Sequence, residues 1–356
     1  MKKIALTAVA TLAAQSAFAG GLDRSGQSVS ALFADGNHIE FSLGFVMPDL
    51  TGTDAASQPT GDVGNDYAQL GFAYKRDLTP NWSMALIFDQ PYGGDVTYAA
   101  SSPIYGGTSG VVTSNGITAL AQYNMGNGFS LHGGVRAIAA DADVTLSGAA
   151  YGGLSGYNFV GDSDYGFGYV AGVAYERPDI ALRVALTYNS EVDLDFATTE
   201  SISGASQLTV TAPQSVNLNF QTGIMADTLL FGSVRWVNWD GFNVTPNTLG
   251  SALVSYTEDV VTYDLGIGRR FNDQWSGALT IGYEEEQGGT SGALGPTDGY
   301  LSFGAGATYT TATGSKITGG VRYIMPGDAN VASGGSTATF SDNTAIAAGL
   351  KFEMKI

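Results

Sequence analysis

The sequence has no cysteine among its 356 residues, and only 13% of them are Asp, Glu, Lys or Arg, against a usual share of about 25%. The missing cysteine excludes disulfides, thiol nucleophiles and cysteine zinc sites. The two histidines, His38 and His132, stand in no His-x-x-x-His, Gly-x-Ser-x-Gly or phosphate-loop pattern. We therefore predict no catalytic residue, no metal site and no cofactor, and expect that the protein is not an enzyme.

Basic residues are also scarce, with 15 Lys and Arg against 33 Asp and Glu and a formal net charge of −18. A nucleic-acid partner needs a basic face, so this balance excludes one. After Gly20 the sequence has no run of 18 apolar residues, and no transmembrane helix is predicted there.

Glycine is abundant, with 50 residues, and hydrophobic residues make up 44% of the chain. Glycine inside a helix costs about 1 kcal/mol per residue relative to alanine, which disfavours an α-helical protein. A chain with this many hydrophobic residues is not expected to be disordered, because it has enough apolar side chains to bury.

The N-terminus reads as a secretory signal peptide over 1–19. Lys2 and Lys3 form a basic start, 4–14 is apolar, and Ala17-Phe18-Ala19 matches a cleavage site. The sequence therefore predicts export to a bacterial envelope.

From residue 38 onward the dominant signal is alternation with period two, which is typical of strands with unlike faces. In 180–188 one face carries Ile, Leu, Val, Leu and Tyr, and the other Ala, Arg, Ala and Thr; 345–356 alternates in the same way. A soluble sandwich would alternate too. The recurring small or charged face opposite an aliphatic and aromatic one is typical of a membrane barrel.

This alternation defines fourteen candidate strands, most of them long enough to cross a bilayer at a tilt. They lie near 38–47, 66–77, 81–91, 111–124, 128–140, 164–177, 179–192, 214–225, 227–240, 258–272, 274–284, 298–311, 314–325 and 342–356. Short connections alternate with long polar ones. We therefore predict an all-β fold, an antiparallel transmembrane β-barrel of about 14 strands over 38–356, in the bacterial outer membrane with both ends periplasmic.

Aromatic residues are placed to form two girdles at the membrane interfaces. Beside the short turns these are Trp82, Phe129, Tyr175, Trp275 and Tyr309; near the long loops they are Tyr188, Trp239, Phe242 and Tyr283. Ordinary core aromatics are the alternative interpretation.

Three groups of residues stand out along the chain: Gly166-Phe167-Gly168 with 171–176 and 185–192, Ala212-Pro213-Gln214-Ser215 with 236–242, and 21–29 directly after the signal peptide. These stretches resemble the FadL (OmpP1/TodX) family of outer-membrane transporters for hydrophobic compounds. The resemblance implies a monomeric barrel with an N-terminal hatch, or plug, over 20–37, which is short for a hatch. It further implies passive uptake of long-chain fatty acids or other hydrophobic compounds, with lateral exit beside a kinked third strand.

The third predicted strand ends at Pro91, Gly93 and Gly94. Proline lacks the N–H that a ladder needs and glycine permits bends, so strand pairing is expected to fail here. We predict a lateral gate at these residues; a plain loop entrance is the alternative.

Charged side chains are predicted on the lumen face about eight residues from the short turns. They are Asp89, Arg136, Arg235, Asp264 and Arg322. One or more of these arginines is a candidate for binding a fatty-acid head group. Alternatively, these groups pair with each other or with Asp23 and Arg24 of the hatch, which avoids buried unpaired charge.

The expected partners are a hydrophobic small molecule such as a fatty acid, outer-membrane lipid and lipopolysaccharide. Acidic residues in the long loops either share divalent cations with lipopolysaccharide phosphates or form a solvated acidic face. Two other functions stay open: an adhesin or structural barrel, and a general diffusion porin.

Overall fold

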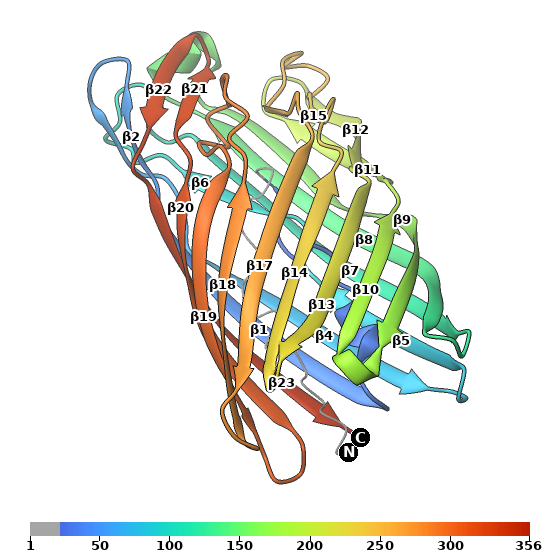
Figure 1. Ribbon diagram of the computed structural model, residues 1–356. Coiled ribbons are helices and arrows are strands. Elements are labelled where there is room, and N and C mark those ends of the chain that lie inside the picture. Colours follow the sequence, from blue (N-terminus) through green and yellow to red (C-terminus); the bar gives the residue numbers. More distant parts are fainter. Residues whose placement is uncertain (1–21) are drawn as a thin grey trace.

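The computed structural model describes residues 22–356, so the predicted signal peptide over 1–19 lies outside the described residues. Fourteen antiparallel strands form a closed barrel, as predicted (Figure 1). They are β1 (His38–Asp49), β4 (Tyr67–Asp77), β5 (Trp82–Asp89), β7 (Ser109–Asn124), β8 (Phe129–Leu146), β9 (Tyr157–Arg177), β10 (Leu182–Asn189), β13 (Ser215–Met225), β14 (Thr228–Val237), β17 (Val260–Arg270), β18 (Trp275–Glu284), β19 (Tyr300–Thr310), β20 (Lys316–Pro326) and β23 (Thr344–Lys355).

The barrel closes where the first wall strand pairs with the last. β1 pairs with β23 on one side and with β4 on the other, so Ser42 lies opposite both Lys351 and Gly71. Each wall strand runs antiparallel to its neighbours, which places all short turns at one end of the barrel and all long connections at the other. We call these the turn end and the loop end.

The long connections contain more regular structure than predicted. Their elements are β2 (Thr51–Asp54), β3 (Pro59–Asp62), β6 (Gly94–Thr97), β11 (Val192–Glu200), β12 (Gly204–Ala212), β15 (Asn243–Val244), β16 (Val254–Ser255), β21 (Ala329–Ser333), β22 (Ser336–Phe340) and the short 3-10 helix η2 (Ala149–Leu154). The long connections over 48–65, 193–213 and 326–341 are therefore not irregular along their whole length. These segments are long enough to pair with each other above the wall, as β2 does with β22.

The two faces of the wall differ as the alternation requires. In β10, Val184 and Leu186 are 36% and 45% exposed on the outside, whereas Ala185 and Thr187 are 2% and 0% exposed on the inside. An exterior of this kind is that of a barrel surrounded by lipid. Within residues 22–356, no helix is long and apolar enough to cross a membrane.

Aromatic side chains line the outside of the barrel at the turn end. Cross-strand pairs bring ring centroids to 4.6–5.1 Å in Trp82–Tyr123, Phe129–Tyr175 and Trp275–Tyr309. At the loop end, Trp239 and Phe242 do not join a girdle as expected. The chain turns over the barrel mouth after Val237, and Trp239 is 1% exposed in an inner apolar cluster.

Candidate functional site

The segment from Leu22 to Asn37 lies inside the barrel and forms the plug. Its 3-10 helix η1 (Ser30–Phe33) presents Ala31 and Leu32 to the wall. There they pack with small and aliphatic side chains of β4, β5, β7 and β9, namely Ala73, Ala85, Ile87, Leu120 and Val170. The described part of the predicted hatch is thus held by an apolar contact on one side of the lumen.

A buried ion pair holds the other side of the plug. Arg235 of β14 donates to both carboxylate oxygens of Asp23, over 2.6 and 3.2 Å. The same guanidinium donates to Ser215 Oγ and Asn217 Oδ1 over 3.0 and 2.8 Å. Asp23 and Arg235 are only 3% and 8% exposed. This satisfied pair leaves Arg235 with little capacity for a ligand.

The plug also pairs with the chain just beyond β5. The Arg24 amide donates to Pro91 O over 2.8 Å, and the Gly93 amide donates to Leu22 O over 2.9 Å. The Arg24 side chain donates from Nε to Gly93 O and lies 3.4 Å from the centre of the Tyr67 ring. The plug therefore supplies the strand partner that the wall lacks here.

The wall is interrupted beside this contact. β4 pairs with β5 from Asp77 to Phe72, and β5 ends at Asp89, before Pro91. Above Phe72, the Leu70 amide of β4 donates instead to the side-chain oxygen Oε1 of Gln90 over 2.7 Å. Pro91, Gly93 and Gly94 lie at this interruption, with Gly94 beginning β6, which pairs with β7.

Asp89 and Arg136 line the lumen next to the plug. Asp89 accepts from Ser25 Oγ over 2.5 Å, while its Oδ1 is buried and has no hydrogen-bond partner within residues 22–356. Arg136 donates to Thr118 Oγ1 and Asn189 Oδ1, both over 2.7 Å. Asp89 is within electrostatic range of Asp23, Arg136 and Arg235, so the structure brings these predicted residues together.

Arg322 and Asp264 form a second, separate pair. Arg322 Nη2 donates to Asp264 Oδ1 over 2.8 Å. Arg322 is 4% exposed, and its Nε and Nη1 are buried without a hydrogen-bond partner in the described chain. Of the predicted arginines Arg136, Arg235 and Arg322, this one has the most unused donors.

Arg322 borders a largely apolar cavity between the plug and the wall, which we call the plug cavity. Its cavity volume is about 110 Å³. Its lining includes Val29, Phe33, Ala185, Phe231 and Ala278 beside Arg322. An apolar cavity with an unsaturated guanidinium at its edge suits a molecule with an apolar body and an acceptor oxygen.

A second cavity reaches the wall interruption, and we call it the wall cavity. Its cavity volume is about 130 Å³. Ser30, Asp89 and Lys351 line it from the lumen, while Leu70, Phe72 and Phe88 line it from the outward face of the wall. The cavity therefore lies beside the interruption between β4 and β5.

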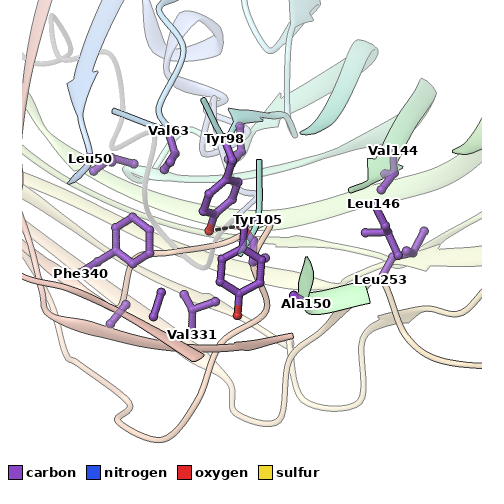
Figure 2. Close-up of a cluster of buried hydrophobic side chains, with 14 of the residues drawn as sticks. Leu50, Val63, Tyr98, Tyr105, Val144, Leu146, Ala150, Leu253, Val331 and Phe340 are labelled. Carbon is purple, nitrogen blue, oxygen red and sulfur yellow. Dashed lines mark hydrogen bonds between the residues drawn. The ribbon is translucent and has the colours of Figure 1, made fainter. Parts of the chain in front are cut away.

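The long connections fold over the loop end and form an apolar cap. Leu50, Val63, Tyr98, Tyr105 and Phe340 pack there, as Figure 2 shows, with side chains from several hairpins. Tyr98 Oη donates to Ala293 O over 2.9 Å. The cap thus covers the loop end, and the plug lies within the lumen.

Glu200, at the end of β11, connects two parts of the cap. It accepts from the Tyr157 hydroxyl and from the Thr248 and Leu249 amides, over 2.9–3.0 Å. Burial by itself raises the pKa of this carboxyl, but the hydrogen bonds from Thr248, Tyr157 and Leu249 favour the charged form, and the pKa is lowered below its ordinary value of 4.5. The charged carboxylate of Glu200 therefore stabilises the cap fully at pH values above its ordinary pKa of 4.5.

The cap is expected to loosen in acid and when Glu200 is replaced. The stabilisation is complete above the unfolded pKa and is lost as pH falls through the lowered folded pKa. Glu200→Gln, which loses charge-assisted bonds worth about 1.5–3 kcal/mol, should reduce amide protection at Thr248 and Leu249 about tenfold at neutral pH. Hydrogen exchange read by mass spectrometry measures this. Glu258→Gln, at an exposed residue of the connection that contains Thr248 and Leu249, is the control, and equal protection in both variants would contradict the role of Glu200.

No protein-family model and no curated protein matches the sequence. Solved structures do match its fold. A Pseudomonas aeruginosa FadL homologue has a TM-score of 0.73 at 13% identity, over 92% of both chains. The fold of this chain is that of the FadL-type barrel. The Pseudomonas putida toluene transporter TodX matches with a TM-score of 0.69 at 14% identity, over 92% of both chains. The Ralstonia pickettii toluene transporter TbuX gives 0.65 at 15%, over 92% of this chain and 91% of that one.

Sequence reasoning missed residues that matter in this FadL-type barrel. Gln90, which accepts from the Leu70 amide, carried no signal beyond its position next to Pro91. Tyr67, whose ring lies under the Arg24 guanidinium, carried none. The alternative that a lumen group pairs with Asp23 named this kind of contact, but that the partner is Arg235 depends on how the plug lies in the lumen, which alternation does not encode. The fold resemblance stated from the sequence is confirmed.

Proposed function

We propose that this protein is an outer-membrane transporter that takes up a hydrophobic small molecule passively, as a monomer, with its turn end and both chain ends in the periplasm. The lipid-facing barrel, the plug and the apolar cavities support this proposal. An apolar solute gains little from a water-filled pore, because it must leave water to be stabilised. It gains from an enclosed apolar cavity.

The observation that carries the proposal is the plug cavity with Arg322 at its edge. The cavity lining is mostly apolar, and the Nε and Nη1 donors of Arg322 lack partners within residues 22–356. A buried donor left unsatisfied costs about 1–3 kcal/mol. A carboxylate that accepts from Arg322 removes this cost, while its alkyl chain contacts Phe33 and Phe231. A long-chain fatty acid has this chemistry.

The similar barrels include toluene transporters, and toluene has no oxygen to accept from an arginine. A neutral aromatic substrate would use the apolar lining alone. Arg322 therefore separates the two substrate classes, because its removal affects a carboxylate and leaves a hydrocarbon unaffected.

We further propose that the solute leaves sideways through the wall cavity. Leu70 and Phe72 border it from outside and are 43% and 39% exposed. The Gln90 side chain, which accepts from the Leu70 amide, and the plug contact at Pro91 and Gly93 close this exit. A shift of the plug would break its contact with Pro91 and Gly93 and would release the Gln90 side chain. A solute that binds beside η1 and moves the plug would therefore open the exit.

The Arg322→Gln variant is expected to bind laurate about tenfold more weakly than the wild type and to bind toluene equally well. A charge-assisted hydrogen bond of about 1.5–3 kcal/mol sets this magnitude. Calorimetry on the detergent-solubilised protein measures both affinities. Arg270→Gln, which removes a guanidinium paired with Asp227 at the turn end, is the control. Unchanged laurate affinity in Arg322→Gln would refute the head-group site, and absent binding of both ligands to the wild type would refute the transporter.

A general porin is an alternative function, and the contents of the lumen argue against it. The plug fills one part of the barrel and the cap covers its loop end. A large, steady single-channel conductance of the wild-type protein would favour the porin over the transporter. An adhesin or structural barrel would show neither conductance nor ligand binding.

A further inference from the structure

A histidine and two glutamates meet at the seam where the barrel closes. His38 and Glu40 come from β1, and Glu353 comes from β23, opposite Glu40. His38 Nε2 lies 3.7 Å from Glu40 Oε2 and 3.8 Å from Glu353 Oε1. The three atoms all lie within 4.8 Å of one another. Two facing strands thus present three donor atoms to one point.

The Nε2 atom of His38 makes no hydrogen bond within residues 22–356. Its residue is 8% exposed, and this nitrogen is buried. A buried, unsatisfied nitrogen costs about 1–3 kcal/mol, which an interaction partner would recover. The nitrogen is directed between two carboxylates, too far from either for a hydrogen bond.

One imidazole nitrogen and two carboxylate oxygens form a recognised ligand set for zinc and similar ions. Zinc holds such ligands at about 2.0–2.2 Å in a tetrahedron. Ligand atoms of such a tetrahedron lie about 3.3–3.6 Å apart. The separations of 3.7 and 3.8 Å from His38 Nε2 are close to this value, and the two carboxylate oxygens, within 4.8 Å of each other, complete the site as their side chains turn toward the ion. We propose that His38, Glu40 and Glu353 bind a divalent transition-metal ion such as Zn²⁺, with water in the fourth position. This site is independent of the proposed transport function.

Neighbouring lysines limit the affinity of this site. Lys351 Nζ lies 2.8 Å from Glu40 Oε2, and Lys316 is within electrostatic range of Glu353. The ion must share Glu40 with the Lys351 ammonium or displace it. The same lysine explains how the seam stays folded without metal, because Glu40 keeps a partner.

A bound ion would connect the first and last strands of the barrel next to the plug. Lys75, opposite His38 on β4, donates from Nζ to Ala34 O at the end of the plug over 3.0 Å. The metal would therefore stabilise both the seam and the place where the plug joins the wall.

The test is calorimetric titration of Zn²⁺ into the untagged, EDTA-treated full chain in detergent. The wild type should bind one ion per chain, and His38→Gln and Glu353→Gln should each bind at least tenfold more weakly. His132→Gln, at the other histidine of the chain, is the matched control and should bind like the wild type. Absence of saturable binding, or equal binding by His38→Gln, overturns the site.

Thermal unfolding of Lys351→Met gives a second measurement that does not need the His38 variant to fold. This substitution leaves Glu40 without its cation, so Zn²⁺ should raise the melting temperature of Lys351→Met by more than that of the wild type. Zn²⁺ that shifts neither melting temperature relative to EDTA overturns the proposal.

Discussion

Replacing Arg235 by Met is expected to release the plug and open the lumen to water. The substitution leaves the Asp23 carboxylate, 3% exposed, without the guanidinium that donates to both its oxygens. Removing one partner of a buried ion pair costs about 3–5 kcal/mol. Since each 1.4 kcal/mol is about tenfold in an equilibrium, the ratio of released to docked plug should rise by roughly 100-fold or more. Single-channel recording should then show a conductance that the wild type lacks.

The double variant Asp23→Leu with Arg235→Met distinguishes loss of the ion pair from general damage. Replacing both charges by apolar side chains leaves no buried unpaired charge, and such replacements are often neutral. The double variant should therefore conduct less than Arg235→Met. Both variants should keep the thermal unfolding transition of the barrel, because the strand pairing of β14 is intact. A closed lumen in Arg235→Met would show that the contacts of η1 alone hold the plug.

The wall could be predicted from sequence because one physical rule decides each of its residues. Leu186 faces lipid and Thr187 faces the lumen, and the side-chain period of a strand is fixed at two. The predicted third strand, 81–91, ends early at Asp89 because Pro91 cannot donate to the ladder. The fifth predicted strand, 128–140, is longer as β8, and extends to Leu146 to support the cap.

The interior could not be predicted because it depends on register and on contacts distant in sequence. Arg136 meets Thr118 and Asn189 only because of how β7, β8 and β10 are staggered. In β11, Leu194 and Phe196 alternate with aspartates, which is a strand signal, but the polar half of the pattern favoured a loop interpretation. Sequence composition indicated an acidic loop end, whereas the cap core beneath it is apolar.

Attaching a bulky thiol reagent at Gly94→Cys is expected to block uptake and leave the barrel folded. The chain has no native cysteine, so the label reaches this position alone. A Cβ at Gly94 would meet only Leu22 Cδ2, at 3.2 Å, so the substitution requires the end of this one flexible side chain to shift by a few tenths of an ångström. The label then occupies the space between the plug and the wall interruption, where the proposed exit begins. Uptake of labelled laurate or toluene into proteoliposomes should fall about tenfold or more.

Gly153→Cys, labelled in the same way, separates obstruction of the exit from a general effect of the reagent. Gly153 is an exposed residue in η2 of the cap with no atom within 4 Å of an added Cβ, so its label lies in open space. Uptake by this variant should match the wild type. A solute that left through the turn end would pass the plug without crossing the wall interruption. Undiminished uptake by labelled Gly94→Cys would therefore contradict the lateral exit but leave the plug cavity and its Arg322 site standing, since those rest on separate contacts.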